Sequence, residues 1–318
     1  MSYTPTAMRI AFLGTPAFAV PSLEALHRAG HEILAVVAQP DRPAGRGQAL
    51  REPATKAWAR ERRLPVLQPE KVRDGRLAAQ LGALRPDLLA VAAYGRILGP
   101  DLLGLAPRGA LNVHGSLLPR WRGAAPIQWA VASGDRETGV SIMQMDEGLD
   151  TGDLLLQRTL PIAPGDTAEA LSPRLAALGG EALVEALEGL ARGAIVPVRQ
   201  EPAQVTTARI LTKEDGRVDW SRPAREIEAR LRGFTPWPGA FTTLEGKLLM
   251  LVAAAVGDLP GASGNPGWAV RLAGRGLAVT CGAGTALLVA RVKPEGRPAQ
   301  DALAFLNGLR KDAVILGT

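Results

Sequence analysis

Two side chains that could stabilise negative charge, Asn112 and His114, lie two positions apart in the apolar segment Ala110 to His114. Alternate side chains of an extended strand point to the same face, so this segment, as a strand, would project the amide and the imidazole together. An amide donor beside an imidazole suits a reaction that builds negative charge on a carbonyl oxygen. For an isolated pair, two structural side chains with satisfied hydrogen bonds are the simpler interpretation.

The residues after this pair indicate where it lies in the fold. Gly115 and Ser116 break the strand, and Pro119 stiffens the chain that follows. In open α/β sheets, sites form where parallel strands end in loops. The stretch 111–123 is therefore predicted to leave the sheet at the edge where a site forms.

A second loop is rich in carboxylates. Residues 140–145 alternate as a strand, and residues 146–153, Asp-Glu-Gly-Leu-Asp-Thr-Gly-Asp, place four carboxylates in eight residues before a partner strand at 154–162. Carboxylates this close repel one another unless most of them are solvated, cap amides or pair with arginine. Only one of the four needs to face the predicted site.

These two stretches together resemble a known family. The pattern Asn112-x-His114-x-Ser116-Leu117-Leu118-Pro119, followed by Leu149-Asp150-Thr151-Gly152, resembles the 10-formyltetrahydrofolate-dependent formyltransferases. Within that family the chain is most similar to the members that formylate methionyl-tRNA, and the similarity runs from Met8 to the C-terminal end. Further segments that carry it are residues 39–47, 117–123, 213–216, 219–220 and 236–240.

The resemblance implies that Asn112, His114 and Asp150 form a catalytic set. In the family reaction a formyl group moves from N10 of folate to an amine, and negative charge gathers on the formyl oxygen. Asn112 and His114 could donate hydrogen bonds to that oxygen, and Asp150 could orient the imidazole and help to receive the proton that leaves the amine. This chemistry needs neither a nucleophilic side chain nor a metal ion.

The resemblance also implies binding residues. Two segments should border the folate, whose flat pterin suits backbone groups and apolar side chains: Ser116, Leu117, Leu118 and Pro119, and Arg96, Ile97 and Leu98. Arg42 and Arg46, in the basic loop 39–48, should meet phosphates of initiator methionyl-tRNA, because guanidinium groups pair with phosphate oxygens. The alternatives are core packing for the two leucines and a solvated loop for residues 39–48.

Length and charge indicate two domains. A chain of 318 residues is long for one domain. We predict an α/β domain at 1–189 with an open, mostly parallel, Rossmann-like sheet, a linker at 190–207, and a small β-barrel at 208–318. The family resemblance implies that the first domain is catalytic and that the barrel is OB-like and binds tRNA. Most of the net charge of +6 belongs to residues 208–318, which contain 15 Lys and Arg and 10 Asp and Glu. A basic surplus favours an acidic partner such as nucleic acid.

Hydrophobic patterns place the elements of the first half. Strands are predicted at 8–14, 32–38, 64–67 and 87–93, and helices at 16–29, 71–84 and 124–132. A helix after 166 has an Asp166–Glu169 capping box, although Pro173 suggests a start one turn later. His27 and His31 flank Gly30 and are expected at the surface. A single glycine at Gly14 disfavours a dinucleotide cofactor.

The second half reads as a helix at 224–232 and short strands broken by glycine. The strands are predicted at 240–244, 247–256, 268–272, 277–281 and 286–292, with turns at 244–246 and 258–267. A basic face could be built from Arg217, Arg222, Arg225, Arg230, Arg232, Arg291, Lys293 and Arg297.

Several absences bound the remaining possibilities. The longest apolar run, 248–256, is too short to span a membrane, and no secretory signal precedes the first strand, so we expect a cytoplasmic location. We also expect a monomer, although the sequence does not determine the oligomeric state. The single cysteine, Cys281, excludes an internal disulfide and is expected to be buried.

The leading hypothesis is formylation of initiator methionyl-tRNA. The alternatives are a formyltransferase for a small amine, a tRNA-binding protein without activity, and a hydrolase that releases formate. The basic segments argue against the first of these, and the complete Asn, His and Asp set argues against the second.

Overall fold

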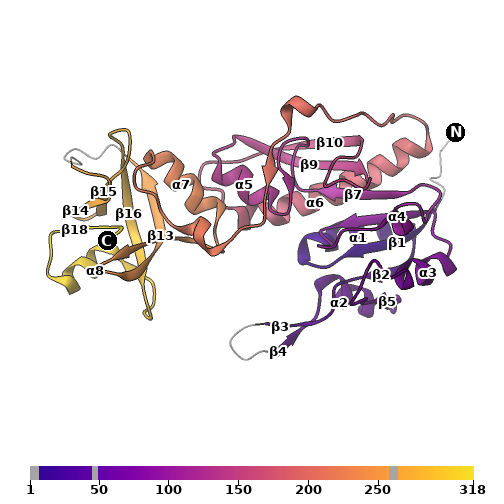
Figure 1. Cartoon of the computed structure of the whole chain (residues 1–318), viewed down its shortest axis with the longest axis horizontal. Helices are drawn as coiled ribbons and strands as arrows, with labels where there is room; N and C mark the ends of the chain where they lie inside the picture. The colour runs from indigo at the N-terminus through magenta and orange to yellow at the C-terminus, as the bar shows by residue number, and fades with distance from the viewer. Residues whose placement is uncertain (1–6, 45–48, 258–263) are drawn as a thin grey trace. The chain divides into compact units, whose positions relative to one another are not determined.

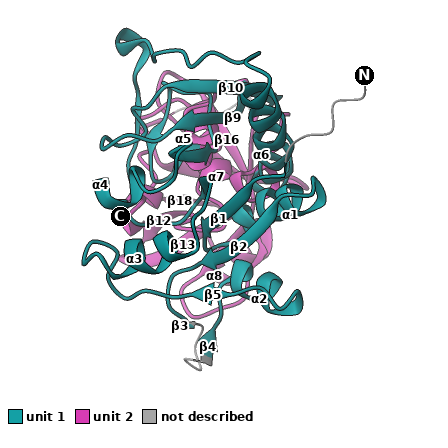
Figure 2. Cartoon of the chain, turned by 90° about the vertical axis from the view of Figure 1, so that its right-hand side faces the viewer, with its two compact units in different colours: residues 1–126, 137–161, 172–209 teal, residues 127–136, 162–171, 210–318 magenta. Residues whose placement is uncertain are grey.

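The computed structural model describes residues 7–44, 49–257 and 264–318 (Figure 1). The chain forms two compact units, which Figure 2 shows in different colours. Unit 1 comprises residues 1–126, 137–161 and 172–209, and unit 2 comprises residues 127–136, 162–171 and 210–318. Each unit is described by itself.

Unit 1 is built on a seven-stranded sheet with the order β10-β9-β7-β6-β1-β2-β5. The five strands from β7 to β5 are parallel to their neighbours, whereas β9 is antiparallel to β7 and β10 is antiparallel to β9. The predicted mostly parallel sheet is therefore confirmed. The strands are β1 (Arg9–Gly14), β2 (Glu32–Val37), β5 (Val66–Leu67), β6 (Leu88–Ala92), β7 (Ala110–His114), β9 (Glu137–Gln144) and β10 (Leu154–Pro161).

Helices cover both faces of this sheet. The short helix η1 (Ala17–Ala19), α1 (Val20–Arg28), α2 (Ala54–Glu61) and α6 (Ala168–Ala191) lie on one side, and α3 (Arg76–Ala83) and α4 (Pro100–Leu103) lie on the other (Figure 2). Gly179 of α6 lies so close to the sheet that an added Cβ would be 2.7 Å from Cγ1 of Val113. On the opposite face, Leu77 of α3 packs in one cluster with Ala110 of β7.

Three predictions for this unit need correction. The predicted loop 39–48 contains β3 (Arg42–Ala44), which pairs antiparallel with β4 (Ala49–Arg51). The helix predicted to begin at residue 71 begins at Arg76. Helix α6 begins at Ala168 and includes Pro173, because a proline removes only one N–H donor and the apolar face of the helix stays buried.

The cap of α6 differs from the predicted capping box as well. The side chain of Thr167 accepts a hydrogen bond from the backbone N–H of Ala170 at 3.1 Å, whereas Asp166 accepts from the N–H of Ala163, which precedes it. The threonine hydroxyl therefore supplies the helix start that the sequence pattern assigned to Asp166.

His31 is buried rather than exposed, in contrast to the prediction. Only 5% of its surface is accessible, and its Nδ1 accepts a hydrogen bond from the backbone N–H of Met8 at 3.2 Å. It immediately precedes β2, at the end of the parallel strands opposite to His114. Burial lowers the pKa of His31, and Glu188 partly opposes that shift.

We expect His31 to make folding sensitive to mild acid. Because its pKa is lower in the folded chain, the unfolded chain binds more protons below about pH 6.5. The free energy of unfolding should therefore fall as the pH drops below that value. A His31→Asn variant, whose Oδ1 can accept from Met8, should lose part of this slope in urea titrations between pH 7 and pH 5. An unchanged slope in the variant would contradict the assignment.

Unit 2 is built on a curled antiparallel sheet with the order β12-β13-β16-β15-β14-β18, with β17 added to β16. The N–H of Gly317, just after β18, donates to the carbonyl of Thr243 in β12 at 2.8 Å, so the two edges of the sheet approach each other. The predicted OB-like architecture is confirmed as a half-barrel. Its strands are β12 (Ala240–Leu244), β13 (Lys247–Val256), β14 (Trp268–Leu272), β15 (Gly276–Thr280), β16 (Ala286–Pro294), β17 (Gln300–Asp301) and β18 (Ala313–Ile315).

Two helices, α7 (Ala224–Gly233) and α8 (Ala302–Leu309), contribute to the core of unit 2. Ile227 of α7 and Leu306 of α8 are each at most 2% exposed within it. Cys281 is buried there too, as predicted, and burial raises the pKa of its thiol to about 12. The sequence did not predict α8 or the short strands β17 and β18. Part of the turn predicted at 258–267 lies outside the described residues.

The segment predicted as a linker, 190–207, contacts the first sheet and its loops. Val198 forms a bridge with Leu154, the first residue of β10. Beyond the short helix η2 (Pro202–Gln204), the strand β11 (Thr207–Ala208) pairs in parallel with β8 (Arg122–Gly123). The proposed boundaries at 189 and 208 stay predictions. Among the described residues no helix is long and apolar enough to cross a bilayer.

Candidate active site

The end of β7 presents Asn112 and His114 on one face of the first sheet. Strand alternation places them on the side of Ala110, which packs with α3 and α4, and opposite to Val113, which meets α6. His114 is buried, with 5% of its surface exposed, and Asn112 is half-buried. The common projection that the alternation predicted is therefore present.

Both nitrogens of the His114 ring face oxygen atoms. Nε2 lies 2.9 Å from the carbonyl oxygen of Trp121, and Nδ1 lies 3.6 Å from Oδ2 of Asp150. A carbonyl oxygen can only accept, so Nε2 carries the proton in the first contact. Nδ1 is then the ring atom through which a proton can pass between His114 and the carboxylate.

Asp150 is held in place by backbone geometry. It adopts a left-handed conformation with φ of 53°, and its Oδ2 accepts a hydrogen bond from the N–H of Gly123 at 2.8 Å. Gly152 lets the loop turn tightly, because a Cβ there would lie 1.7 Å from the carbonyl oxygen of Gln144. Asp146 instead accepts from Gly148 and Thr151 within the loop. Of the four carboxylates, Asp150 is the one that meets the imidazole.

The amide of Asn112 makes no hydrogen bond with any described residue. Its amide atoms are not among the buried polar atoms without a partner, so they are accessible to solvent. The side chain of Asn112 therefore makes no structural hydrogen bond within the described residues, which favours a binding role over a structural one. The amide can instead donate to a bound molecule.

Two further residues of the site were not predicted from the sequence. Trp121, with φ of 62°, supplies the carbonyl that faces His114, and its N–H donates to Oγ1 of Thr206 at 2.9 Å. Gln200 donates to the backbone of the Asp150 loop. Trp121 lies in the segment 117–123 that carries the family resemblance, but it acts through its backbone carbonyl, which no side-chain pattern reveals. Gln200 acts through contacts with backbone far from it in the sequence.

Hydrogen bonds hold the predicted folate segment 116–119 at Ser116 and at Leu118. Ser116 is fully buried, and its Oγ donates to the carbonyl of Arg120 at 2.6 Å. Oγ of Ser141 accepts from the N–H of Leu118 at 3.0 Å, and the bond from Leu118 to Pro119 is cis. Leu118 is 3% exposed, whereas Leu117 is half-buried. A folate contact by these residues stays a prediction, and packing accounts for the burial of Leu118.

The second predicted folate segment, 96–98, follows β6. Arg96 is exposed, as is Ile97 at 63%, whereas Leu98 is 3% exposed and belongs to the core cluster with Tyr94. Of this segment, Arg96 and Ile97 are accessible to a ligand. Within the described chain no group of three or more His, Cys, Asp or Glu side chains could hold a metal ion.

The predicted tRNA residues lie apart from this network. Arg42, in β3, is exposed and donates to Oε1 of Gln39 at 2.9 Å. Arg46 lies outside the described residues. Nearby, hydrogen bonds from Gln68 and Lys56 hold the pKa of Asp41 below its usual range.

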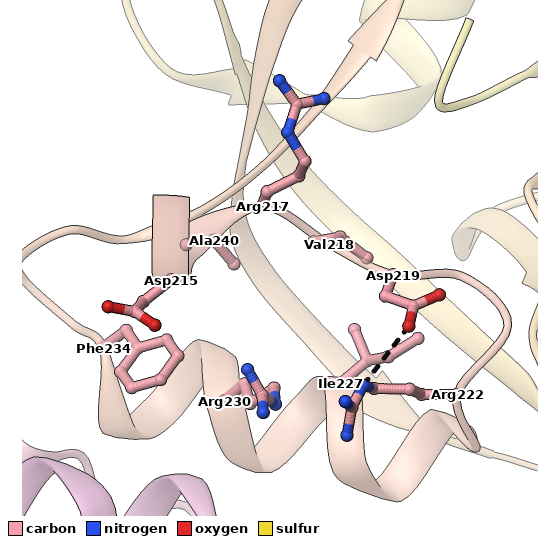
Figure 3. A pocket seen from close by; sticks show the side chains of 10 residues that line it. Asp215, Arg217, Val218, Asp219, Arg222, Ile227, Arg230, Phe234 and Ala240 are labelled. Carbon is pink, nitrogen blue, oxygen red and sulfur yellow. Dashed lines mark ion pairs between the residues drawn. The ribbon is translucent and has the colours of Figure 1, made fainter. Parts of the chain in front are cut away.

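Unit 2 has a pocket at the predicted basic face (Figure 3), lined among others by Asp215, Arg222, Arg230 and Phe234. Arg222 forms ion pairs with Asp219 at 3.4 Å and Glu226 at 3.2 Å, so its charge is partly neutralised. Burial, together with the charge of Arg222, lowers the pKa of Arg230. In contrast, Arg291 and Lys293 of β16 are exposed and have no ion pair among the described residues.

Comparison with known proteins places this site in a family. Residues 8–187 match the family described as formyl transferase, and residues 210–310 match the formyl transferase C-terminal domain. A protein of Anaeromyxobacter dehalogenans (strain 2CP-1) named methionyl-tRNA formyltransferase is 73% identical over 312 residues, which cover 98% of this chain and 100% of that protein. The chain belongs to the formyl transferase family. Its predicted membership is thus confirmed.

Solved structures of formyltransferases share the fold. An N-formyltransferase from Helicobacter canadensis, in complex with folinic acid and dTDP-3-aminofucose, matches with a TM-score of 0.67 and 15% identity over 89% of this chain and 98% of that one. HypX from Aquifex aeolicus, in complex with tetrahydrofolic acid, matches with a TM-score of 0.62 and 20% identity over 96% of this chain. The match spans 48% of the HypX chain, about half its length.

Proposed function

We propose that this formyltransferase transfers the formyl group of 10-formyltetrahydrofolate to the amino group of initiator methionyl-tRNA. The relative with 73% identity over its whole length carries that acceptor in its name, and the folate-bound structures have the same fold. The observation that carries the proposal is the unpartnered amide of Asn112 beside the His114–Asp150 pair. These groups suit a reaction in which charge builds on a carbonyl oxygen.

The roles follow from the geometry. The amine nitrogen attacks the formyl carbon, negative charge develops on the formyl oxygen, and the bond to N10 of folate then breaks. Asn112 donates to that oxygen, and the Nε2–H of His114, which donates to the carbonyl of Trp121 in the free protein, exchanges that contact for the formyl oxygen. Asp150, 3.6 Å from Nδ1, orients the imidazole and takes up the proton that the amine loses, which ends on the leaving nitrogen.

One assay separates this function from its alternatives. Purified protein receives 10-formyltetrahydrofolate labelled in the formyl group, together with methionyl-tRNA, uncharged tRNA, a small amine or no acceptor. Label on methionyl-tRNA alone supports the proposal. Label on the small amine favours a small-molecule formyltransferase, release of labelled formate without an acceptor favours a hydrolase, and tRNA binding without transfer favours a binding protein.

Arg42 gives a test of the tRNA contact. If its guanidinium meets a phosphate, Arg42→Ala should lower kcat/KM for methionyl-tRNA by about 10-fold, a loss typical of one charged contact, while leaving the KM for the folate unchanged. The dependence of log KM for tRNA on log salt concentration should become shallower by about one unit. Glu52→Ala, at a half-buried site just beyond β4 where the carboxylate pairs with Arg60, is the control. An unchanged salt slope would remove Arg42 from the tRNA interface.

The monomeric state and the cytoplasmic location stay predictions. A monomer is checked by light scattering with and without tRNA.

A further inference from the structure

Gln200 is a buried side chain whose amide is engaged at both ends. It is 4% exposed, and its Nε2 donates to the carbonyl of Asp150 at 2.9 Å and to the carbonyl of Gly152 at 2.7 Å. Its Oε1 accepts from Arg122, at 3.0 Å from Nε and 2.7 Å from Nη2. One amide therefore joins the loop that carries Asp150 to the strand that carries Gly123.

These contacts connect the candidate catalytic residue Asp150 to β8 in two ways. Gly123 donates its N–H to Oδ2 of Asp150, and its neighbour Arg122 is linked through Gln200 to the carbonyl of the same Asp150. The side chain and the backbone of Asp150 are thus fixed to adjacent residues of β8. Because Asp150 is in a left-handed conformation, which non-glycine residues rarely adopt, such anchoring has a clear use.

Only a primary amide can make this set of contacts. A glutamate at position 200 could still accept from Arg122, but it has no N–H for the two carbonyls. A lysine could donate to the carbonyls, but it would repel the guanidinium. The two kinds of partner, a cation and two carbonyl oxygens, therefore select glutamine.

We infer that Gln200 is a positioning residue for the proposed formyl transfer: it holds the Asp150 carboxylate against Nδ1 of His114. It touches neither substrate, and its effect passes through Asp150. This inference rests on the proposed function, so the experiment compares each variant with the measured rate of the unaltered protein. If the unaltered protein transfers no formyl group, that result contradicts the proposed function and not the role of Gln200.

The variant Gln200→Met keeps a side chain of similar length and removes all four hydrogen bonds. We expect kcat for formyl transfer to fall about 10- to 100-fold, as a displacement of about 1 Å in a catalytic group does, while KM for the folate and for methionyl-tRNA changes by less than about twofold. Gln200→Glu keeps the contact with Arg122 and should show the same loss of kcat. It serves as the second variant if Gln200→Met does not fold.

A double-mutant cycle distinguishes positioning from a general loss of structure. In an Asp150→Asn background the carboxylate is already absent, so adding Gln200→Met should lower kcat by less than about twofold more. Gln144→Ala is the matched control, because its Nε2 also donates to a backbone carbonyl, that of Ala110 at 3.2 Å, at the opposite end of β7 from His114. It should leave kcat within about twofold.

The outcomes decide the matter. The inference is supported if Gln200→Met greatly lowers kcat in the otherwise unaltered protein but lowers it little further in the Asp150→Asn variant. Equal losses in both backgrounds, a loss that appears in KM rather than in kcat, or no loss at all for either Gln200 variant would overturn it.

Discussion

Asp150→Asn should lower kcat for formyl transfer by about 10²- to 10⁴-fold, the range for loss of a general acid or base, with little change in the affinity for either substrate. Asparagine has the shape of aspartate and can keep the hydrogen bond from the N–H of Gly123. Because the same Oδ2 lies 3.6 Å from Nδ1 of His114, a neutral amide oxygen would then replace the carboxylate oxygen that faces the ring. The ring would lose the negative partner that receives its proton.

Asp146→Asn is the matched control for this experiment. Asp146 belongs to the same loop but is exposed, and it accepts hydrogen bonds only from Gly148 and Thr151 among the contacts that define the loop. The kcat of the Asp146→Asn variant should stay within about twofold of the kcat of the unaltered protein. Pre-steady-state measurements with labelled donor check both values. Similar losses in the two variants would mean that the loop conformation, rather than the carboxylate of Asp150, matters.

Asn112→Ala should lower kcat by about 10²- to 10³-fold, the usual cost of losing one donor to a developing oxyanion. The expectation depends on the amide having no partner among the described residues, so that it is available to the formyl oxygen. Asn112→Asp should cost at least as much, because it replaces a donor by a charged acceptor of the same size. The free energy of unfolding should change little in Asn112→Ala, since no hydrogen bond within the described fold is lost.

Measurements of kcat and urea unfolding curves for both Asn112 variants test whether Asn112 acts in catalysis without stabilising the fold. If Asn112→Ala destabilised the protein by several kcal/mol, or if Asn112→Asp retained normal activity, the asparagine would be structural and the role in charge stabilisation would be withdrawn.

The strands could be predicted well because apolar and β-branched runs bounded by glycine leave few alternatives. β7, β12, β13 and β14 begin and end at the predicted residues. The hairpin of β3 and β4 was missed because each strand has only three residues and gains order from pairing with the other. β18 was missed for the same reason, since its three residues depend on contacts with β14.

The candidate site was predictable in part. Alternation alone placed Asn112 and His114 on one face, but nothing in the sequence pattern distinguished Asp150 from its neighbouring carboxylates; only the family resemblance did. Gln200 lies 50 residues beyond Asp150, in a polar segment that composition identifies merely as a connection. Its role depends on a fold that brings two separate loops to one amide, and a linear pattern does not contain that information.

The contacts of residues 198–208 also bear on how the protein can be divided for experiments. Gln200, Thr206 and Ala208 together hold Arg122, Trp121 and Gly123, and an added Cβ at Gly123 would lie 2.6 Å from the carbonyl of Ala208. A truncated protein ending at residue 189 would retain Asn112, His114 and Asp150 but would lack the strand that supports them. A fragment intended to study catalysis in isolation should therefore extend through residue 208.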